Sequence, residues 1–443
     1  MSIQLCRSVA PSLAGRFLLT SSVLLALSVA TIAAAGTMDT QVPMDGHIWQ
    51  TTRGNVTYNA KDDYIDLGRS STADLKSETF GSGTIEFDMK SAGGIMGVTF
   101  HQQGKTGDAL YFRPSADCVT SDECIQYMRM DHGIFEWEMF GDNQTHAPFH
   151  PDSWNHVKMV VNGRQMSVWI NGEHLSVPVD GALVGAYDEG GITLHGPATY
   201  AHFTIRPEGG PMARHQVQPG SAIDPHFVRY WKISRALVMP SVFDHALGEN
   251  TGVSPVLRSM PAQNMYWREL RAMQSGLVNV TDALGDDQKG DHIVSAWLKT
   301  TVLSDRNQIK HVSIGWSREV WVFVNGKLVF ADKNLYGIPS ASKKPDGRLS
   351  LENGAFDLPL AKGRNDVVVM LDDNMGGGEQ HFGWGLMLRL ADMDGVILPK
   401  AVGTETTGGN ATSDQVTKPY TLAPKSPRDN RTASPIPSST PQR

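Results

Sequence analysis

Apolar and polar side chains alternate along several short segments in the first half of the chain. In residues 84–89 every second side chain is apolar, which is typical of a β-strand with one buried face. Residues 156–161 repeat the pattern and lead into Asn162-Gly163, a pair that favours the tight turn of a hairpin. Residues 166–170 alternate again before a second Asn-Gly pair at Asn171. The pattern therefore predicts three consecutive antiparallel strands.

The first unit closes with two further strand patterns, at residues 192–194 and 201–205. The stretch 264–275 is compatible with either a short helix or a strand. We find no regular alternation of strands with helices, so a parallel sheet is not expected.

A second set of strand patterns follows in the last third of the chain. Residues 320–324 meet Asn325-Gly326 and return as residues 327–330, which is a strong hairpin signature. The nearly continuous apolar run 367–371 and the alternating run 383–390 complete this set. We therefore predict an all-β protein made of two consecutive jelly-roll β-sandwiches.

The ends of the chain differ from these two units in composition. Arg7 and Arg16 precede the apolar run 17–32, and small residues follow this run. This is the order of a secretory signal peptide. The last residues are rich in Thr, Ser and Pro and have few large apolar side chains, so they cannot offset the entropy of ordering. The predicted organisation is a signal peptide (1–35), a first sandwich (45–207), a linker (208–224), a second sandwich (225–400) and a disordered tail (401–443).

Composition and charge narrow the classes of partner. The 443 residues include 44 Gly and 24 Pro, a balance that favours strands and turns. The formal net charge is −7, so the chain lacks the cationic surface that nucleic acids require, and we expect no nucleic-acid partner. After the signal peptide no apolar segment is long enough to span a bilayer, so we expect no membrane span in the mature chain. Together with the signal-peptide pattern, the lack of a later membrane span predicts a secreted or periplasmic protein.

The cysteines fit an oxidising compartment. The chain has 3 Cys, and removal of Cys6 with the signal peptide leaves Cys118 and Cys124. We predict that these two form a disulfide. The residues between them are mostly polar, so the bridge would close a surface loop between two strands. The alternative, a zinc site, lacks a second close pair of ligands.

Several residues in the first unit carry a resemblance to a known family. They are Trp154, Val157, Lys158, Val161, Gly163, Val168, Ile170, Asn171, Gly172, Gly190, Gly191, Ile192, Thr193, Leu194, Ala201, Phe203 and Ile205. This run resembles the second half of a concanavalin A-like or laminin-G-like jelly roll. It is similar to secreted bacterial proteins of that class, including the 3-keto-disaccharide hydrolase domain. The resemblance spans residues 80–207 and implies the fold more than an activity.

The second unit resembles a galactose-binding-like jelly roll. The resemblance rests on short motifs at residues 231–234, 276–279, 324–326, 363–365 and 383–385. That fold is commonly a carbohydrate-binding or accessory module, although a fold does not fix a function.

Sugar recognition combines an aromatic face with a few directed hydrogen bonds. In the first unit, neighbouring predicted strands offer this mixture at Tyr111, Arg113, Gln126, Arg129 and Trp137. The alternative is that Trp137 and Tyr127 belong to the core and that Arg113 pairs with a local acid. In the second unit the corresponding candidates are Trp316, Trp321, Tyr336, Trp384 and Arg389.

Carboxylate pairs are the candidates for catalysis. Glycoside hydrolysis uses two carboxyl groups about 5–9.5 Å apart, and positions i and i+2 of a strand share a face. Glu86 with Asp88, and Glu136 with Glu138, have this spacing. Glucanases of this fold carry Glu-x-Asp-x-x-Glu, and Ser91 stands where the last acid would be, which counts against that mechanism. The alternative is that these carboxylates line the solvated face of a sheet.

The sequence predicts no metal site and no cofactor, because clustered Cys and His ligands are missing. Asp372-Asp373-Asn374, which precede a run of glycines, either supply calcium ligands or form a solvated turn. We interpret the chain as a non-catalytic, carbohydrate-associated binding protein with a saccharide or other extracellular ligand. The alternatives are a glycoside hydrolase or lyase acting on extracellular saccharides, with Glu136 and Glu138 as its catalytic candidates, and a cell-surface structural or protein-interaction component.

Overall fold

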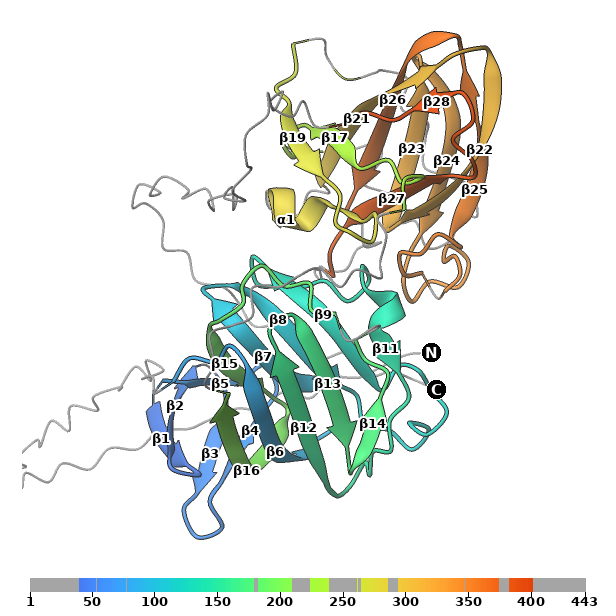
Figure 1. Ribbon diagram of the computed structural model, residues 1–443. Coiled ribbons are helices and arrows are strands. Elements are labelled where there is room, and N and C mark those ends of the chain that lie inside the picture. The colour runs from blue at the N-terminus through green and yellow to red at the C-terminus, as the bar shows by residue number, and fades with distance from the viewer. Residues whose placement is uncertain are drawn as a thin grey trace, which may run out of the picture. The chain divides into compact units, whose positions relative to one another are not determined.

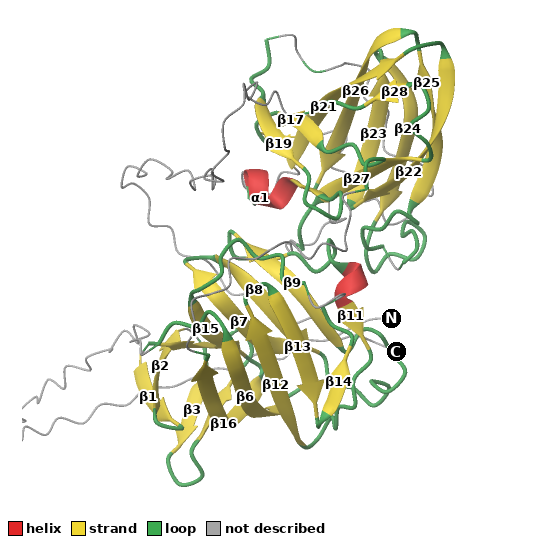
Figure 2. Ribbon diagram, viewed as in Figure 1, coloured by secondary structure: helices red, strands yellow, loops and turns green. Residues whose placement is uncertain are grey.

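The protein is built almost entirely from antiparallel β-sheet (Figures 1 and 2). The structure is a computed structural model that describes residues 40–52, 54–76, 78–178, 182–208, 224–238, 261, 264–285, 294–345, 347–373 and 382–400. Within these ranges the helical elements are α1 (Val280–Leu284) and the single 3-10 turn η1 (Gly141–Asn143). None of the described helices has the length and apolar character needed to cross a bilayer. The predicted all-β sandwich class is confirmed.

The first sandwich, coloured blue to green in Figure 1, consists of two sheets. In the part of the chain that the structure describes, its larger sheet has nine strands in the order β1 (Thr40–Met44), β2 (His47–Thr52), β5 (Thr72–Leu75), β15 (Gly191–His195), β7 (Met96–Gln103), β8 (Thr106–Phe112), β9 (Ile125–Asp131) and β10 (Ile134–Phe135), with β11 (Gln144–Thr145) paired to β9. The seven described strands of the facing sheet run β14 (Glu173–Leu175), β13 (Gln165–Ile170), β12 (Trp154–Asn162), β6 (Gly83–Ser91), β16 (Ala198–Pro207), β4 (Tyr64–Leu67) and β3 (Val56–Asn59).

The second sandwich, coloured green-yellow to red, also has two sheets (Figure 1). Counting described residues alone, the larger sheet has eight strands: β19 (Arg268–Arg271), β17 (Tyr230–Ile233), β21 (Val294–Ser304), β26 (Gly363–Asp372), β23 (Arg318–Val324) and β24 (Lys327–Asn334) in order, with β18 (Leu237–Val238) and β28 (Val396–Ile397) also paired to β21. The smaller described sheet runs β20 (Val278–Asn279), β27 (Gly385–Leu390), β22 (Gln308–Trp316) and β25 (Gly354–Leu360).

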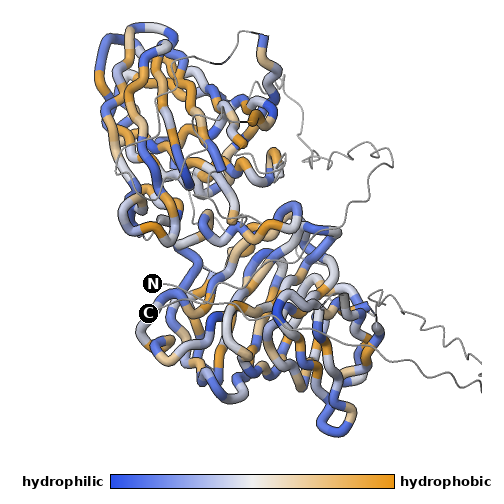
Figure 3. The backbone as a smooth tube through the Cα atoms, turned by 180° about the vertical axis from the view of Figure 1, so that it is seen from behind, coloured by the Kyte–Doolittle hydropathy of each residue, from blue (hydrophilic) through white to orange (hydrophobic). Residues whose placement is uncertain are grey.

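The alternation of side chains produces the first hydrophobic core. In β6 the apolar residues Ile85, Phe87 and Met89 are fully buried, whereas the polar residues between them are half-buried. Strands β12, β13 and β14 follow one another as antiparallel neighbours, which confirms the three predicted strands. Figure 3 shows apolar and polar positions distributed along the strands of both sandwiches.

The hairpin between β23 and β24 illustrates why Asn-Gly was informative. Val324 pairs with Lys327, and the two residues between them, Asn325 and Gly326, have φ angles of 50° and 81°. Positive φ at both positions gives the type of two-residue turn that matches the twist of a hairpin. The stretch left open between helix and strand, 264–275, contains the strand β19.

Strand β23 buries both of its faces. Its valines, Val320 and Val322, belong to the core between the two sheets. Trp321 and Phe323 point the other way and pack in a second apolar cluster with Trp297. Trp321, a candidate for sugar binding, is therefore covered by protein.

Three of the apolar clusters of the described residues make up the two sandwich cores and the packing between them. One core draws on residues 42–203 and another on residues 228–396, as expected for two sandwiches. A third cluster combines residues of both, including Met128, Trp137, Leu277 and Leu349. The chain up to Pro399 forms one compact unit. The predicted signal peptide and tail, and all but the ends of the predicted linker, lie outside the described residues.

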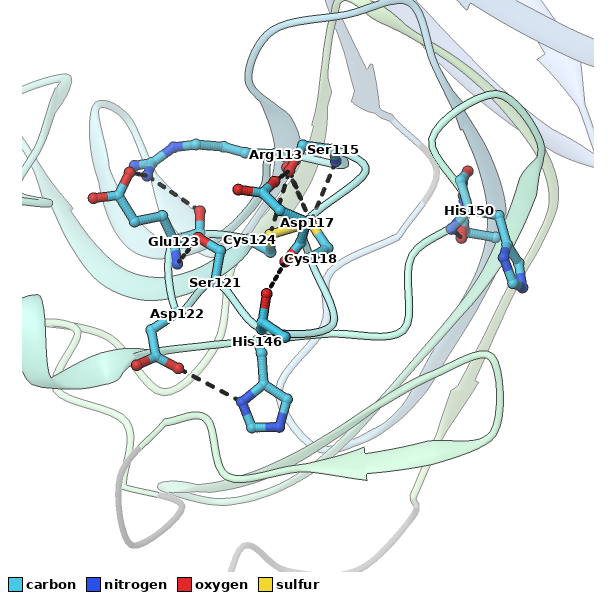
Figure 4. The surroundings of a disulfide bond; sticks show 12 residues. Arg113, Ser115, Asp117, Cys118, Ser121, Asp122, Glu123, Cys124, His146 and His150 are labelled. Atoms are coloured by element: carbon cyan, nitrogen blue, oxygen red, sulfur yellow. Dashed lines mark hydrogen bonds and ion pairs between the residues drawn. A yellow bond between two sulfur atoms is a disulfide. The ribbon is translucent and has the colours of Figure 1, made fainter.

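Cys118 and Cys124 form the predicted disulfide, with sulfur atoms 2.08 Å apart (Figure 4). Both cysteines are buried and belong to the core of the first sandwich. The loop between them lies at the surface, where Val119 is 64% exposed. The bridge therefore ties an exposed loop to the core.

Candidate functional site

One face of the nine-stranded sheet points away from the core and is here called the outer face. Two rows of paired positions cross it. The first row is Thr72, His195, Gly97, Tyr111 and Gln126, from β5 to β9. The second row is Gln50, Asp74, Thr193, Thr99, Ala109 and Met128, from β2 to β9. Neighbours along each strand, such as Val98 and Leu110, turn into the core, so the alternation fixes which residues this face presents.

The half of the outer face over β5, β15 and β7 is polar. The Thr193 hydroxyl lies 2.9 Å from Asp74 Oδ1 and 2.7 Å from Gln102 Oε1. A hydroxyl carries one proton, so it donates to only one of these acceptors at a time. The other acceptor can then receive a hydrogen bond from a ligand hydroxyl. The Asp74 side chain is 32% exposed, so a ligand can reach it.

An aromatic group borders this polar half. The rings of Tyr111 and Phe135 meet edge to face at 4.7 Å, and the His195 ring lies 5.8 Å from the first and 5.5 Å from the second. His195 Nε2 lies 2.7 Å from the Thr99 hydroxyl. Burial lowers the pKa of His195 to about 4, so its ring is neutral at pH 7. Tyr111, Phe135 and His195 are of intermediate burial, and Tyr111 and Phe135 also pack against the apolar cluster that contains Trp137.

The other half of the outer face is apolar and is covered by residues of the second sandwich. Ala109 and Met128 pack with Trp137, Leu277 and Leu349. This covering makes the apolar half interior. In the polar half the Asp74 side chain is 32% exposed, whereas Thr193 and Thr99 are buried.

Three predicted binding residues, Arg113, Gln126 and Trp137, come together in this covered region. The Arg113 guanidinium stacks 4.0 Å above the Trp137 ring, and the Gln126 amide donates to the Trp137 carbonyl at 2.7 Å. Arg348 of the second sandwich also lies over the Trp137 ring, at 5.4 Å. Trp137 is only 7% exposed, as the core alternative required. Burial, together with the charge of Arg348, lowers the pKa of Arg113 to about 10. These residues join the two sandwiches rather than facing a ligand.

Arg129 has the same structural role. Its guanidinium lies 2.6 Å from a carboxylate oxygen of Asp131 and 3.4 Å from one of Asp282. Since Asp282 belongs to the second sandwich, this contact also crosses between the two units.

The sequence offered a solvated sheet face as the alternative position for Glu136 and Glu138. The structure places neither carboxylate on such a face. They lie in a turn after β10 and are fully buried. The Asn279 amide donates to both Glu136 oxygens, at 3.0 and 2.8 Å, and Arg318 pairs with Glu138 at 3.1 Å. Burial raises the pKa of Glu136, and it raises the pKa of Glu138 to about 7 against the attraction of Arg318. In this structure neither carboxylate is accessible to a saccharide.

Glu86 and Asp88 do lie on a solvated face, as expected. Asp88 accepts from His156 and His202, each at 2.7 Å, and Glu86 pairs with Lys158 and Arg206. Their carboxylates are thus engaged in surface ion pairs.

The second-sandwich candidates are not brought together. Trp316 and Trp384 are buried in its core, so their ring faces pack against protein and are not open to a ligand. Arg389 lies on the opposite side of β27 from the core residues Leu388 and Leu390, and it pairs with Asp224 at 2.7 Å.

The sequence predicts no metal site for this chain. Within the described ranges no group of three or more His, Cys, Asp or Glu side chains is arranged to hold a metal ion. Asp372 and Asp373 of the proposed calcium turn are buried, and Asn374 and the glycines after it lie outside the described residues.

One family model matches part of the chain. Residues 42–205 match the family model of the 3-keto-alpha-glucoside-1,2-lyase-like domain. This match covers the first sandwich, including the outer face. The comparison with curated proteins gives no match.

Several solved structures are similar to parts of the chain. A carbohydrate-binding module, CBM66, from Bacillus subtilis is 15% identical with a TM-score of 0.27, covering 35% of this chain and 92% of that one. The Caenorhabditis elegans galectin LEC-6 is 13% identical with a TM-score of 0.22, covering 33% of this chain and 99% of that one. A Bacillus licheniformis β-glucanase is 11% identical with a TM-score of 0.24, covering 36% of this chain and 92% of that one. At such TM-scores these likenesses support no inference about function.

Sequence reasoning proposed Tyr111 as a site residue and did not propose Asp74, Gln102, Thr193 or His195. These four come from three strands that are distant in the sequence. Each occupies an ordinary polar position of an alternating strand, so only the pairing of β5, β15 and β7 reveals the cluster.

Proposed function

We propose that this protein is a secreted or periplasmic carbohydrate-binding protein that holds a neutral oligosaccharide on the polar half of its outer face without cleaving it. One observation carries the proposal: the Thr193 hydroxyl sits between two acceptors, Asp74 and Gln102, on the same strand as His195, whose ring contacts that of Tyr111. Sugar hydroxyls both donate and accept hydrogen bonds, and sugar CH patches pack on aromatic faces.

The dimensions of the face support an extended ligand. From Asp74 on β5 to Tyr111 on β8 there are three strand-to-strand steps, or about 14 Å. That span suits an oligosaccharide better than a single ring. The match of residues 42–205 to a domain family described by a glucoside substrate supports the saccharide class.

The distribution of carboxylates supports binding without catalysis. In the two described rows of the outer face, Asp74 supplies the one carboxylate. A two-carboxylate glycosidase needs a second carboxyl group about 5–9.5 Å away. Glu136 and Glu138, which the sequence offered for this role, are buried.

A glycan array probed with the full chain, followed by titration calorimetry on any glycan retained, tests the proposal. We expect Asp74→Asn and Tyr111→Ala to weaken binding about tenfold or more, because each removes a directed contact. Asp88→Asn is the matched control, since Asp88 is a partly exposed carboxylate on the facing sheet. Binding to no glycan, or equal binding by all three variants, would refute the proposal.

The runner-up is a lyase or hydrolase, favoured by the family description alone. Incubation of the full chain with 3-keto-glucosides, followed by detection of the released sugar, separates the two proposals. Release that disappears in Asp74→Asn would replace the binding proposal with an enzymatic one.

A further inference from the structure

A group of cations and aromatic rings lies together at one edge of the eight-stranded sheet of the second sandwich. We call this group the basic edge; it consists of Tyr230, Lys232, Arg235, Tyr266, Trp267, Arg271 and Lys299. Most of these residues belong to β17, β19 and β21, which are neighbours in the sheet. It lies on a different sandwich from the outer face, so an inference about it goes beyond the proposed function and can fail independently.

Each ring of the basic edge carries a cation. Lys299 Nζ lies 3.9 Å from the centre of the Trp267 ring. The guanidinium of Arg271 lies 5.5 Å from the Tyr230 ring, and that of Arg235 lies 5.1 Å from the Tyr266 ring. These distances fall in the range of cation–π attraction.

The cations of the basic edge are not neutralised locally. Lys232 and Lys299 occupy paired positions of β17 and β21. Burial lowers the pKa of Lys299, and the nearby charge of Lys232 lowers it further. Judged on the described residues, neither these two lysines nor Arg235 and Arg271 form an ion pair with a carboxylate.

Among the described residues, two carboxylates lie near the edge. Glu269 lies opposite Lys232 in the register but forms no ion pair with it within the described structure. Asp366 pairs with Arg364 at 3.1 Å, and its charge also acts on Lys299. With four cations against these two carboxylates, the described groups of the basic edge are net positive on a chain whose formal net charge is −7.

We propose that the basic edge binds an acidic polysaccharide. A guanidinium stacked on a ring keeps its N–H donors directed outward in its own plane, where they can pair with carboxylate or sulfate groups. Tyr266 is 60% exposed and offers a ring face on which a sugar can pack. The basic edge thus offers cations for the anionic groups of the polysaccharide and an aromatic face for its sugar rings.

The charge of the whole chain favours a polysaccharide over a nucleic acid. A nucleic acid carries a dense line of phosphates, and its binding depends on a broadly cationic protein. An acidic polysaccharide has a lower charge density, so the acidic remainder of this chain repels it less.

Retention of the full chain on immobilised polygalacturonate and on heparin, with dextran as the neutral comparison, tests the proposal. The two acidic columns distinguish a carboxylate from a sulfate preference. We expect retention on at least one of them, and the triple variant Lys232→Gln/Arg271→Gln/Lys299→Gln should weaken it about tenfold or more at low salt. The matched control, Lys61→Gln/Lys105→Gln/Lys327→Gln, changes the net charge by the same amount at exposed sites elsewhere and should leave retention unchanged.

Tyr266→Ala tests whether the ring contributes to binding in addition to the charges. It removes an exposed ring and no charge, so weaker retention at constant ionic strength supports a saccharide-specific surface. Three outcomes would overturn the proposal: equal loss in the control triple, no retention on either acidic column, and tighter binding to duplex DNA or to phosphatidylglycerol vesicles than to both polysaccharides. Circular dichroism confirms that each variant is folded.

Discussion

Glu138 and Arg318 form a 3.1 Å ion pair in which the carboxylate is fully buried and the guanidinium is only 2% exposed. The pair joins a turn of the first sandwich to the first residue of β23 in the second. A buried charge without its partner is strongly destabilising, whereas replacing both charges by apolar groups is often neutral.

Removal of one member of this pair should therefore cost more than removal of both. We expect Arg318→Ala to lower the free energy of unfolding by about 3–5 kcal/mol. The double variant Glu138→Leu/Arg318→Met should recover most of that loss. Urea unfolding followed by tryptophan fluorescence measures both, and a double variant no more stable than Arg318→Ala would contradict the assignment.

Stability should depend on pH through Glu138. Burial raises its pKa from 4.5 to about 7, so between these values the folded chain binds a proton that the unfolded chain has released. Stability then falls as pH rises through this window and levels off above it. Glu138→Gln should flatten this part of the profile. The difference between the two unfolding curves, measured from pH 4 to 8, isolates Glu138 from other buried acids; parallel curves would count against the raised pKa.

The disulfide should make a modest contribution. Cys118 and Cys124 are separated by 6 positions, and closing so short a loop is worth about 2 kcal/mol. We expect Cys118→Ser/Cys124→Ser to lower the thermal midpoint to the level of the reduced wild-type chain. Adding dithiothreitol should not lower the midpoint of the double variant further, and a further fall would indicate a second redox-sensitive group.

The shared hydroxyl of the outer face is tested by Thr193→Val. Valine keeps the shape but removes the donor between Asp74 and Gln102, so glycan binding should fall about tenfold. Thr193→Ser, which retains the hydroxyl, should bind almost as the wild type does. Calorimetric titration compares the two, and equal affinity of Val and Ser variants would exclude a role for this hydroxyl.

The second face of β23 should be as important as its core face. Trp321 is fully buried, so Trp321→Ala should lower the free energy of unfolding by about 3–5 kcal/mol. Trp154, which is 43% exposed, provides the control, and Trp154→Ala should have a much smaller effect. Similar losses in the two variants would mean that the cluster around Trp321 contributes little.

The strands could be read from the sequence because their signals are local. Alternation along β6 and β12, and the Asn-Gly turns, depend on neighbours within a few residues, and the structure confirms them. The paired cysteines were also identifiable, since only two remain after the predicted signal peptide.

The site could not be read in this way, because it depends on pairing between distant strands. Trp137 looked like a sugar platform, yet Arg113 and Arg348 occupy its ring faces. Glu136 and Glu138 had the spacing of a catalytic pair, but Asn279 and Arg318 come from more than a hundred residues away to bury them. Periodicity assigns a side chain to one face of a strand and does not reveal which segment covers that face.

The short disulfide loop reaches further than its length suggests. Glu123 lies inside it and faces the buried guanidinium of Arg348 at 3.3 Å, although 225 positions separate the two residues. The Cys118–Cys124 bridge thus constrains the loop that carries Glu123, whereas its partner Arg348 is synthesised much later. If the disulfide forms before the second sandwich docks, Glu123 is already held in place when Arg348 reaches it. If the disulfide forms later, Arg348 must pair with a Glu123 side chain whose loop is not yet constrained.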